Sequence, residues 1–372
     1  MSTGSPLAGN EMRGKGGRLG LLATCLGLSI ALAGCGGSSH HGTSGTEDRS
    51  VASSSSGDTS SNTDGSTPGT SDGETDPGEG NDPGIDYAYY REAAYPRAVN
   101  LPLNFITTAK GKKLSVRVTV PADENGEPIQ GTFPAVLVQS GYNTNLLSQM
   151  FMGVPGNVML GASDSFLVRR GYVQVSVDAL GTGASEGGWE LFGKDEQEAF
   201  ADAVDWIPEQ AWSNGKIGCA GISYMAISSL FAAEQRPDAI QAVFASLPMG
   251  DPMRGTVNTG GMINGVFMST WMTITQFLST QNVTTELFNP KYMSQLIQTT
   301  QEHVDQVDSY YLPLIDGALN GAAETTFDGP FWRTRSPIEN IDKIRAPTMI
   351  LGTVDDIFQR DEPLLYEKKK KN

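Results

Sequence analysis

The stretch Lys216-Ile-Gly-Cys-Ala-Gly-Ile-Ser-Tyr-Met-Ala226 decides the fold of this chain. An apolar, strand-like run ends at Gly221-Ile-Ser-Tyr224, and small and apolar residues follow at helical spacing. A serine on such a sharp strand-to-helix turn holds its hydroxyl above a sheet, over the free N–H groups of the new helix. Ser223 is therefore predicted to be a nucleophile for acyl transfer. The alternative is a serine that only caps a helix, since Met225 stands where the pattern has a small residue.

Apolar runs on either side of this stretch predict an α/β fold. Runs with the length and continuity of buried strands occur at residues 114–120, 135–139, 173–177, 217–220 and 348–352, with a weaker one at 242–245. Helical patterns lie between them at 195–210 and 224–235. Alternating strands and helices predict a mostly parallel sheet with helices on both faces.

The segment 256–328 interrupts this alternation. It is rich in Met, Thr, Gln and Phe, with helical apolar spacing around 262–277 and 296–307 and no convincing strand. Because it follows the elbow unit directly, we expect a helical cap at about 256–330, over the carboxyl edge of the sheet. The alternative is extra helical packing without a role at the site.

Several spaced motifs resemble one group of α/β-hydrolases. They are Gly171-Tyr-Val-Gln-Val-Ser-Val-Asp178, Gly181-Thr-Gly-Ala-Ser-Glu-Gly187, Trp206, Gln210-Ala-Trp-Ser-Asn-Gly-Lys-Ile-Gly218, Gly221-Ile-Ser-Tyr224, Phe331-Trp-Arg-Thr-Arg-Ser-Pro337 and Ile344-Arg-Ala-Pro347. In this order, across residues 114–366, they are similar to the cocaine esterase and X-Pro dipeptidyl-peptidase (CocE/NonD) family. The resemblance implies a serine hydrolase with an α/β-hydrolase core, a helical cap and, in most members, a C-terminal β-sandwich.

The resemblance also implies roles for individual residues. Ser223 matches the family nucleophile, and the backbone N–H of Tyr224 matches one oxyanion donor. Tyr142, in the loop after the strand at 135–139, matches a tyrosine whose hydroxyl is the second donor. A phenol and an amide that converge on a developing oxyanion are donors of the kind that acyl transfer needs. The alternative for Tyr142 is a packing aromatic in a loop.

The acid of a triad should follow a later strand. Thr348-Met-Ile-Leu-Gly-Thr-Val-Asp-Asp356 supplies a strand, a glycine turn and then two carboxylates. By resemblance to the family, Asp355 orients the base, with Asp356 as the second choice. Without Ser223 upstream, these adjacent acids would indicate only a solvated turn. No metal site and no cofactor are expected.

The base has no clear candidate. The sequence contains 3 histidines. His40 and His41 stand in a low-complexity segment, and His303 precedes Asp355, which is the wrong order for this fold. We expect His303 to be a solvent-facing helix residue. Because no histidine follows Asp355, we expect the chain to be a fragment that lacks its catalytic histidine, further strands and the β-sandwich, nearly inactive and poorly soluble as written.

The N-terminus predicts export. Arg13, Lys15 and Arg18 precede a short apolar run that ends at Leu32-Ala33-Gly34-Cys35. This resembles a bacterial lipobox, in which Cys35 would be lipidated after removal of residues 1–34. The alternative is an ordinary secretory signal. Residues 35–84 are rich in Ser, Gly, Thr and Asp, so a disordered tether is expected there, and the hydrolase domain would occupy 85–372.

Charge and cysteine content limit the classes of partner and of covalent cross-link that this protein can have. The formal net charge is −16, which argues against nucleic-acid binding. With Cys25 removed and Cys35 lipidated, Cys219 alone remains, which excludes an intrachain disulfide and predicts a packed thiol. We expect an exported serine hydrolase that is anchored to a membrane by its lipid and cleaves a small ester or amide. The alternatives are an X-Pro dipeptidyl-peptidase and a non-catalytic surface lipoprotein with a hydrolase fold.

Overall fold

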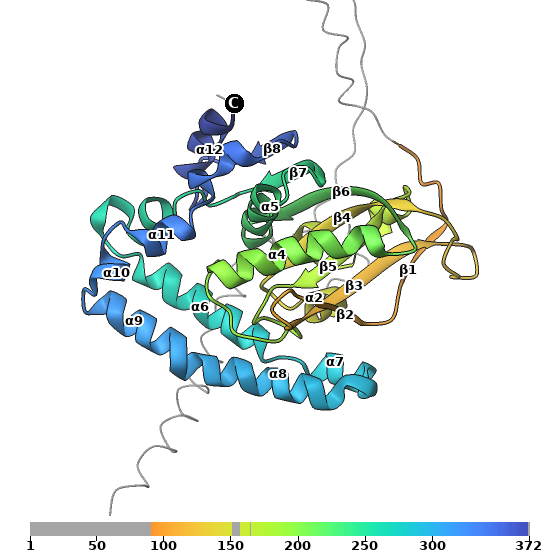
Figure 1. The fold of residues 1–372 in the computed structure, drawn as a ribbon, viewed down its shortest axis with the longest axis horizontal. Coiled ribbons are helices and arrows are strands. Elements are labelled where there is room, and N and C mark those ends of the chain that lie inside the picture. The colour runs from red at the N-terminus through yellow and green to blue at the C-terminus, as the bar shows by residue number, and fades with distance from the viewer. Residues whose placement is uncertain (1–90, 151–156, 164, 371–372) are drawn as a thin grey trace, which may run out of the picture. The chain divides into compact units, whose positions relative to one another are not determined.

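The computed structural model describes residues 91–150, 157–163 and 165–370 (Figure 1). The predicted signal segment 1–34, Cys35 and the predicted tether to residue 84 lie outside the described residues, as do His40 and His41. Within the described ranges, no helix combines the length and apolar character needed to cross a membrane.

An eight-stranded sheet forms the centre of the described chain. Its strand order is β1-β3-β5-β4-β6-β7-β8, with β2 paired to β3 beside β1. Strands β5, β4, β6, β7 and β8 run parallel, and the strands before them pair antiparallel. The bounds are β1 Arg97–Asn100, β2 Asn104–Thr107, β3 Lys113–Ala122, β4 Phe133–Ser140, β5 Val173–Asp178, β6 Ser213–Ile222, β7 Ile240–Ser246 and β8 Thr348–Leu351. The predicted α/β class is confirmed.

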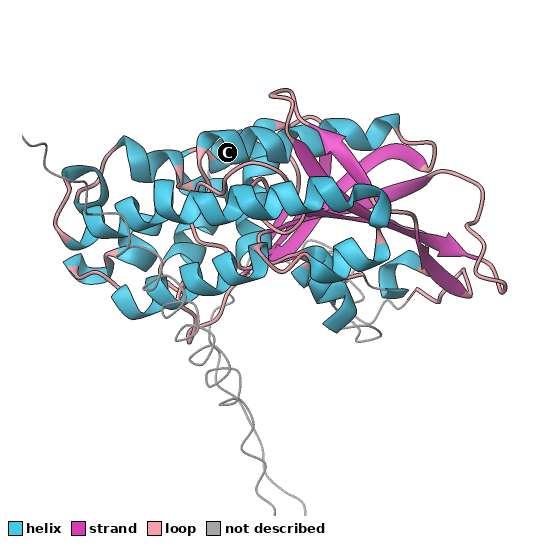
Figure 2. Ribbon diagram, turned by 90° about the horizontal axis from the view of Figure 1, so that it is seen from below, coloured by secondary structure: helices cyan, strands magenta, loops and turns pink. Residues whose placement is uncertain are grey.

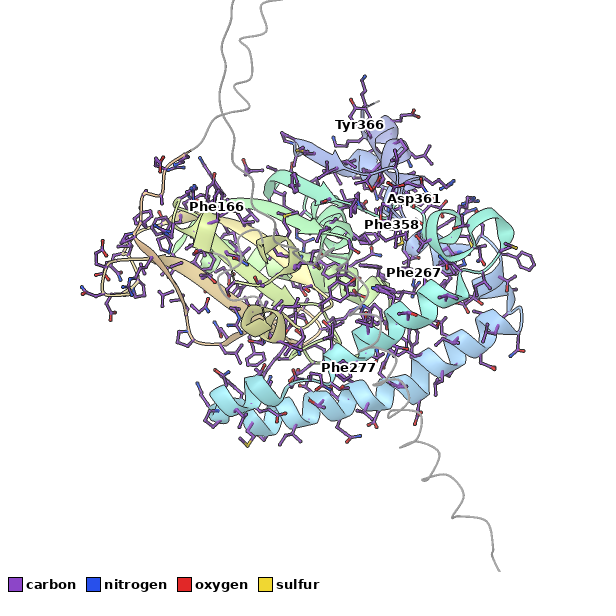
Figure 3. The ribbon with its side chains drawn as sticks, turned by 180° about the vertical axis from the view of Figure 1, so that it is seen from behind. Phe166, Phe267, Phe277, Phe358, Asp361 and Tyr366 are labelled. Atoms are coloured by element: carbon purple, nitrogen blue, oxygen red, sulfur yellow. The ribbon has the colours of Figure 1, made fainter. Side chains whose placement is uncertain are left out.

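Helices cover both faces of this sheet. Helices α4 (Lys194–Trp206) and α5 (Tyr224–Gln235) lie in front of it in Figure 1. Helix α2 (Thr144–Met150) and the short α3 (Ser165–Val168), which carries Phe166, lie on the opposite face (Figure 3). Figure 2 shows the sheet between its two helical layers. The sandwiching explains why every residue of β5 is buried, including the polar Gln174, Ser176 and Asp178 that alternate with its valines.

The segment after β7 is helical. It contains no strand among its described residues, as its apolar spacing predicts. Helices α6 and α8 lie side by side within it (Figure 1). Its elements are η3 Pro252–Val257, η4 Thr259–Gly261, α6 Gly265–Ser279, α7 Val283–Phe288, η5 Pro290–Tyr292, α8 Met293–Gln306, η6 Val307–Tyr311, α9 Leu312–Leu319, α10 Ala323–Thr326 and α11 Pro330–Thr334.

The remaining elements are short connections and one terminal helix. They are η1 Asn157–Leu160, η2 Ile207–Glu209, η7 Pro337–Glu339, η8 Ile341–Lys343 and α12 Asp361–Lys370. Helix α12 is fixed to the loop after β7, because the Asp361 carboxylate accepts hydrogen bonds from the backbone N–H groups of Gly250 (2.9 Å) and Asp251 (2.7 Å). This loop then leads into the helical segment.

The parallel register brings the candidate residues to one edge of the sheet. Strands β4, β6 and β8 end at Ser140, Ile222 and Leu351, and the loops after them carry Tyr142, Ser223 and Asp355 respectively. The carboxyl ends of parallel strands share an edge, which is where ligands bind in open α/β sheets.

Candidate active site

Ser223 lies on a strained turn between β6 and α5. Its φ and ψ are 55° and −121°, and a positive φ in a non-glycine residue costs on the order of 1–3 kcal/mol. Its backbone N–H donates to the carbonyl of Ser246 at 2.9 Å, which holds the turn against β7. A Cβ atom on Gly221 would approach the backbone of Met225 to 2.4 Å, so the turn requires a glycine two residues before the serine.

Two potential oxyanion donors flank this serine. Tyr224 is the first residue of α5, so its backbone N–H has no partner within the helix. The hydroxyl of Tyr142 interacts with the Ser223 side chain and accepts a hydrogen bond from Nε1 of Trp271 at 2.9 Å. Burial raises the pKa of the Tyr142 phenol, while its side-chain hydrogen bonds with Trp271 and Ser223 act in the opposite direction. The phenol is therefore protonated at neutral pH and can donate.

A buried glutamate behind the elbow was missed by sequence reasoning. Glu196 accepts hydrogen bonds from the Tyr224 hydroxyl and, at 2.7 Å, from the backbone N–H of Phe192. Leu191 and Phe192 both have positive φ, at 56° and 62°, so Glu196 fixes a strained turn beside the nucleophile. Burial raises the pKa of Glu196 to about 7. In the sequence it is one more acid in the first turn of a helix, a position that is ordinary for Glu.

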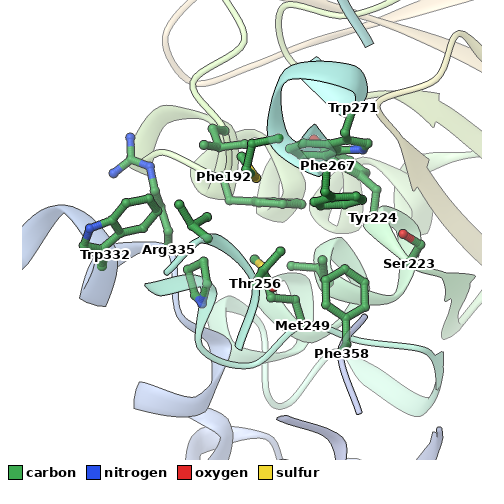
Figure 4. A pocket seen from close by; sticks show the side chains of 15 residues that line it. Phe192, Ser223, Tyr224, Met249, Thr256, Phe267, Trp271, Trp332, Arg335 and Phe358 are labelled. Carbon is green, nitrogen blue, oxygen red and sulfur yellow. The ribbon is translucent and has the colours of Figure 1, made fainter. Parts of the chain in front are cut away.

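A narrow, mostly apolar pocket opens beside Ser223 (Figure 4). Trp332 and Arg335 lie toward one end of it, and Ser223 lies toward the other (Figure 4). Among the described residues that line it, Arg335 alone carries a charge, and there is no carboxylate. The lining consists of Leu191, Phe192, Ser223, Tyr224, Ile227, Met249, Pro252, Thr256, Val257, Phe267, Met268, Trp271, Trp332, Arg335 and Phe358. The pocket thus combines walls from the sheet side with walls from the helical segment.

The predicted acids lie in the loop after β8. Asp355 is exposed, and Asp356 is half-buried. The Asp356 carboxylate accepts from the backbone N–H groups of Ile357 (2.7 Å) and Phe358 (3.1 Å), which shapes the turn that brings Phe358 to the pocket. Over the described part of the chain, no hydrogen bond joins either aspartate to Ser223. The choice between these two acids stays a prediction.

The expectation that His303 faces solvent is wrong. Its side chain is 1% exposed, on the inner face of α8. Nδ1 lies 2.9 Å from the carbonyl oxygen of Ser279, and Nε2 lies 2.8 Å from that of Ser185. Burial lowers the pKa of His303, so the ring is neutral at physiological pH. Both ring nitrogens are occupied by backbone carbonyls, which makes His303 a structural link and leaves the base of Ser223 unassigned.

Cys219 behaves as a packed thiol. It is 3% exposed within β6, and burial raises its pKa to about 12. It is therefore an unreactive core residue, as predicted. Across the described ranges, no cluster of three or more His, Cys, Asp or Glu side chains has the arrangement of a metal site.

Comparison with known proteins places this architecture in a family. The model of the X-Pro dipeptidyl-peptidase (S15) family matches residues 110–372. The chain belongs to this family. The matched region contains β4, β6 and β8, the elbow and the helical segment, so the S15-family assignment covers every residue of the candidate site.

Relatives of this S15-family chain include proteins named as esterases and as peptidases. A protein named as a serine esterase from Mycobacterium bovis is 30% identical over 207 residues, which cover 50% of this chain and 32% of that protein. Cocaine esterase from Rhodococcus is 37% identical over 87 residues, 23% of this chain and 15% of the esterase. A protein named as a Xaa-Pro dipeptidyl-peptidase from Bacillus anthracis is 28% identical over 137 residues, 31% of this chain and 23% of that protein. The chain thus matches less than a third of each relative's length.

Solved structures share the fold. An α-amino acid ester hydrolase superposes with a TM-score of 0.52 at 17% identity, over 80% of this chain and 49% of that chain. An aminopeptidase from a Thaumarchaeota archaeon superposes with a TM-score of 0.50 at 19% identity, over 77% of this chain and 48% of that chain. At this level of identity the likeness establishes the α/β-hydrolase fold alone.

Proposed function

We propose that this chain is a serine hydrolase that cleaves carboxylic esters through an acyl-enzyme on Ser223. One observation carries the proposal: the Tyr142 hydroxyl meets Ser223 on a strained elbow, beside an apolar pocket. In the first step the Oγ of Ser223 attacks the ester carbonyl and gives up its proton to a base. The backbone N–H of Tyr224 and the hydroxyl of Tyr142 donate to the oxyanion that forms. The C–O bond then breaks, the alcohol leaves with a proton, and water releases the acid.

The lining of the pocket favours a neutral acyl group. A peptidase that releases X-Pro dipeptides must hold the charged amine of its substrate, for which a carboxylate is the natural partner. Fourteen of the fifteen residues that line the pocket are uncharged, the exception being Arg335, and none is an acid. An aromatic or branched acyl group would bury its surface against Phe267, Trp271 and Trp332.

Two other functions remain as candidates on specific grounds. The family name and the Bacillus anthracis relative favour an X-Pro dipeptidyl-peptidase. A binding module without catalysis is favoured by the position of His303, which is the one histidine among the described residues and is held away from Ser223 by two backbone carbonyls.

Chemical rescue tests these three functions in one experiment. Hydrolysis of p-nitrophenyl benzoate and of Ala-Pro p-nitroanilide is measured with and without added imidazole, which can serve as an external base. We expect imidazole-stimulated ester cleavage that is lost in Ser223→Ala and retained in Ser269→Ala, an exposed serine on α6. Preferred cleavage of the anilide would favour the peptidase. Binding of benzoate without cleavage of either substrate would favour the binding module.

We further propose that the protein is exported and anchored through a lipid on Cys35. The support is the lipobox-like Leu32-Ala33-Gly34-Cys35 after a basic and apolar N-terminus. In a bacterial host, the native chain should partition with membranes, and Cys35→Ala should appear in the soluble fraction or as an uncleaved precursor. Equal partitioning of the two would contradict the anchor.

A further inference from the structure

We propose that Trp271 is a positioning residue for the oxyanion hole: its indole N–H fixes the Tyr142 hydroxyl so that the phenol proton is directed at the substrate's carbonyl oxygen. The inference rests on the proposed function, because it assigns a task within the same site. It adds a residue of the helical segment to the catalytic machinery of the sheet edge.

The chemistry of the two groups sets the direction of the hydrogen bond. An indole N–H can only donate, whereas a phenol hydroxyl can both donate and accept. At 2.9 Å, Nε1 of Trp271 donates to the Tyr142 oxygen. The phenol proton must therefore point to a second acceptor, and the side chain that interacts with this hydroxyl is Ser223. When substrate is bound, the oxyanion that forms beside Ser223 can accept a hydrogen bond from the Tyr142 hydroxyl.

A donor behind the phenol also strengthens it. Hydrogen bonds in a chain polarise one another, so a phenol that accepts from an indole becomes a better donor. The effect is greatest where charge develops on the acceptor, as it does on the carbonyl oxygen in the transition state. Trp271 therefore acts through Tyr142 and need not touch the reacting atoms.

Packing holds the indole in the orientation that this role requires. Phe267, one turn earlier on α6, stacks on Trp271 with an interplanar angle of 8° and a centroid distance of 6.3 Å. Trp189 packs edge-on at 5.3 Å and is itself fully buried. An indole held on two sides by rings has few alternative rotamers, so its N–H stays aimed at Tyr142.

A second contact keeps α6 in register with the loop that carries Tyr142. The side-chain amide of the adjacent Asn143 donates to the carbonyls of Leu278 and Gln281, both at 3.0 Å. Asn143 adopts a left-handed backbone conformation, with a φ of 59°, which asparagine tolerates better than most residues. The loop and the end of α6 are therefore joined at two points. The orientation of the oxyanion donor depends on how the helical segment is seated.

A double-mutant cycle tests whether Trp271 acts through Tyr142. The measurement is the rate at which a fluorophosphonate labels Ser223 in the presence of imidazole; an O–P bond forms, fluoride leaves, and imidazole takes the serine proton. We expect Tyr142→Phe to slow labelling by about 100-fold and Trp271→Phe by about 10-fold. The double variant should be no slower than Tyr142→Phe alone, because the indole has no phenol to orient.

A matched control separates positioning from packing. Phe358→Leu disturbs the same pocket without removing a side-chain hydrogen bond, and its ring is not among those that pack on Trp271, so its effect should multiply with that of Tyr142→Phe. The proposal would be overturned if the effects of Trp271→Phe and Tyr142→Phe on the labelling rate multiplied in the double variant. It would also be overturned if Trp271→Phe left the labelling rate unchanged.

A second measurement needs no chemistry at Ser223. Fluorotyrosine at position 142 is titrated by ¹⁹F NMR in the native background and in Trp271→Phe. Loss of a donor to the phenolate should raise the pKa of this phenol by about 1. An unchanged pKa would overturn the proposal. A raised pKa without labelling in the native chain would support the Trp271–Tyr142 pairing while contradicting the proposed hydrolase.

Discussion

Ser223 adopts a backbone conformation that side chains disfavour. Its φ of 55° and ψ of −121° place it on a turn that glycine would adopt without strain. A strained residue at the end of a strand is retained where its geometry serves function, which fits the proposed nucleophile. The strain should be measurable once the hydroxyl is removed.

We predict that Ser223→Gly is more stable than Ser223→Ala by about 1 kcal/mol. Both variants lose the hydroxyl, so their difference isolates the strain of a Cβ atom at positive φ, less the larger entropy of glycine in the unfolded chain. Urea unfolding of both variants measures it. An alanine variant of equal or greater stability would contradict a strained elbow.

Glu196 should make the stability of the protein depend on pH. Its folded pKa of about 7 lies above its ordinary value of 4.5 because burial penalises the carboxylate. The native state therefore binds more protons than the unfolded state between pH 4.5 and 7, and stability falls as pH rises through this window. The fall attributable to Glu196 is at most about 3 kcal/mol.

Replacing Glu196 by Gln removes this titration. We predict that the free energy of unfolding of Glu196→Gln falls less between pH 4.5 and 7 than that of the native chain. The control Glu209→Gln, at an exposed position, should keep the native slope. Denaturant unfolding at several pH values gives the slopes, and parallel native and Glu196→Gln curves would refute the assignment.

Helix α8 is joined to the rest of the molecule through His303. The ring lies between the carbonyl of Ser279, at the end of α6, and that of Ser185, in the loop after β5. A neutral imidazole donates to one carbonyl at a time, and its removal leaves a buried acceptor unpaired and a cavity behind. Without the imidazole, helix α8 should be held less firmly against α6 and the loop after β5.

We predict that His303→Ala lowers the free energy of unfolding by about 2–4 kcal/mol. Val304→Ala, at the next and exposed position of the same helix, should change it by less than about 0.5 kcal/mol. Ester cleavage without added imidazole should be unchanged in folded His303→Ala, whereas a loss that added imidazole restores would identify His303 as the base after all.

At the scale of the whole molecule, β8 leaves one edge of the sheet open. Among the described residues it pairs with β7 alone, and Met349 and Leu351 on it are 56% and 44% exposed. Val354 beyond the strand is 83% exposed. An apolar edge strand with unpaired backbone groups is a template for association with another chain.

We predict that Met349→Lys reduces aggregation of the purified protein, because a charge on an edge strand opposes strand pairing. Met262→Lys is the matched control, since Met262 is also exposed, at 77%, but lies outside the sheet. Static light scattering against protein concentration compares the two. An equal improvement from both variants would indicate a general effect of charge and contradict a role for the β8 edge.

The strands that sequence reasoning recovered are those with long apolar runs. The predicted runs at 114–120, 135–139, 173–177, 217–220, 242–245 and 348–352 correspond to β3 to β8, each within a few residues. Strands β1 and β2 were missed because they are short, with four residues each. Of these eight residues only Ile106 is buried, so neither strand carries a buried-strand pattern. Both strands pair with the side of β3 that is not paired with β5, and no local sequence pattern reveals this pairing.

Local sequence thus determined strands β3 to β8, the elbow at Ser223 and the helical character of the segment after β7, because apolar period and turn chemistry act over a few neighbouring residues. The tertiary structure alone decided which distant groups meet. It buried His303 between two carbonyls, set Glu196 behind Tyr224, and placed the indole of Trp271 on the hydroxyl of Tyr142, 129 residues away. Such contacts depend on how helices and strands pack, and packing brings together residues that are far apart in the sequence. No local sequence pattern indicates which of these residues will meet.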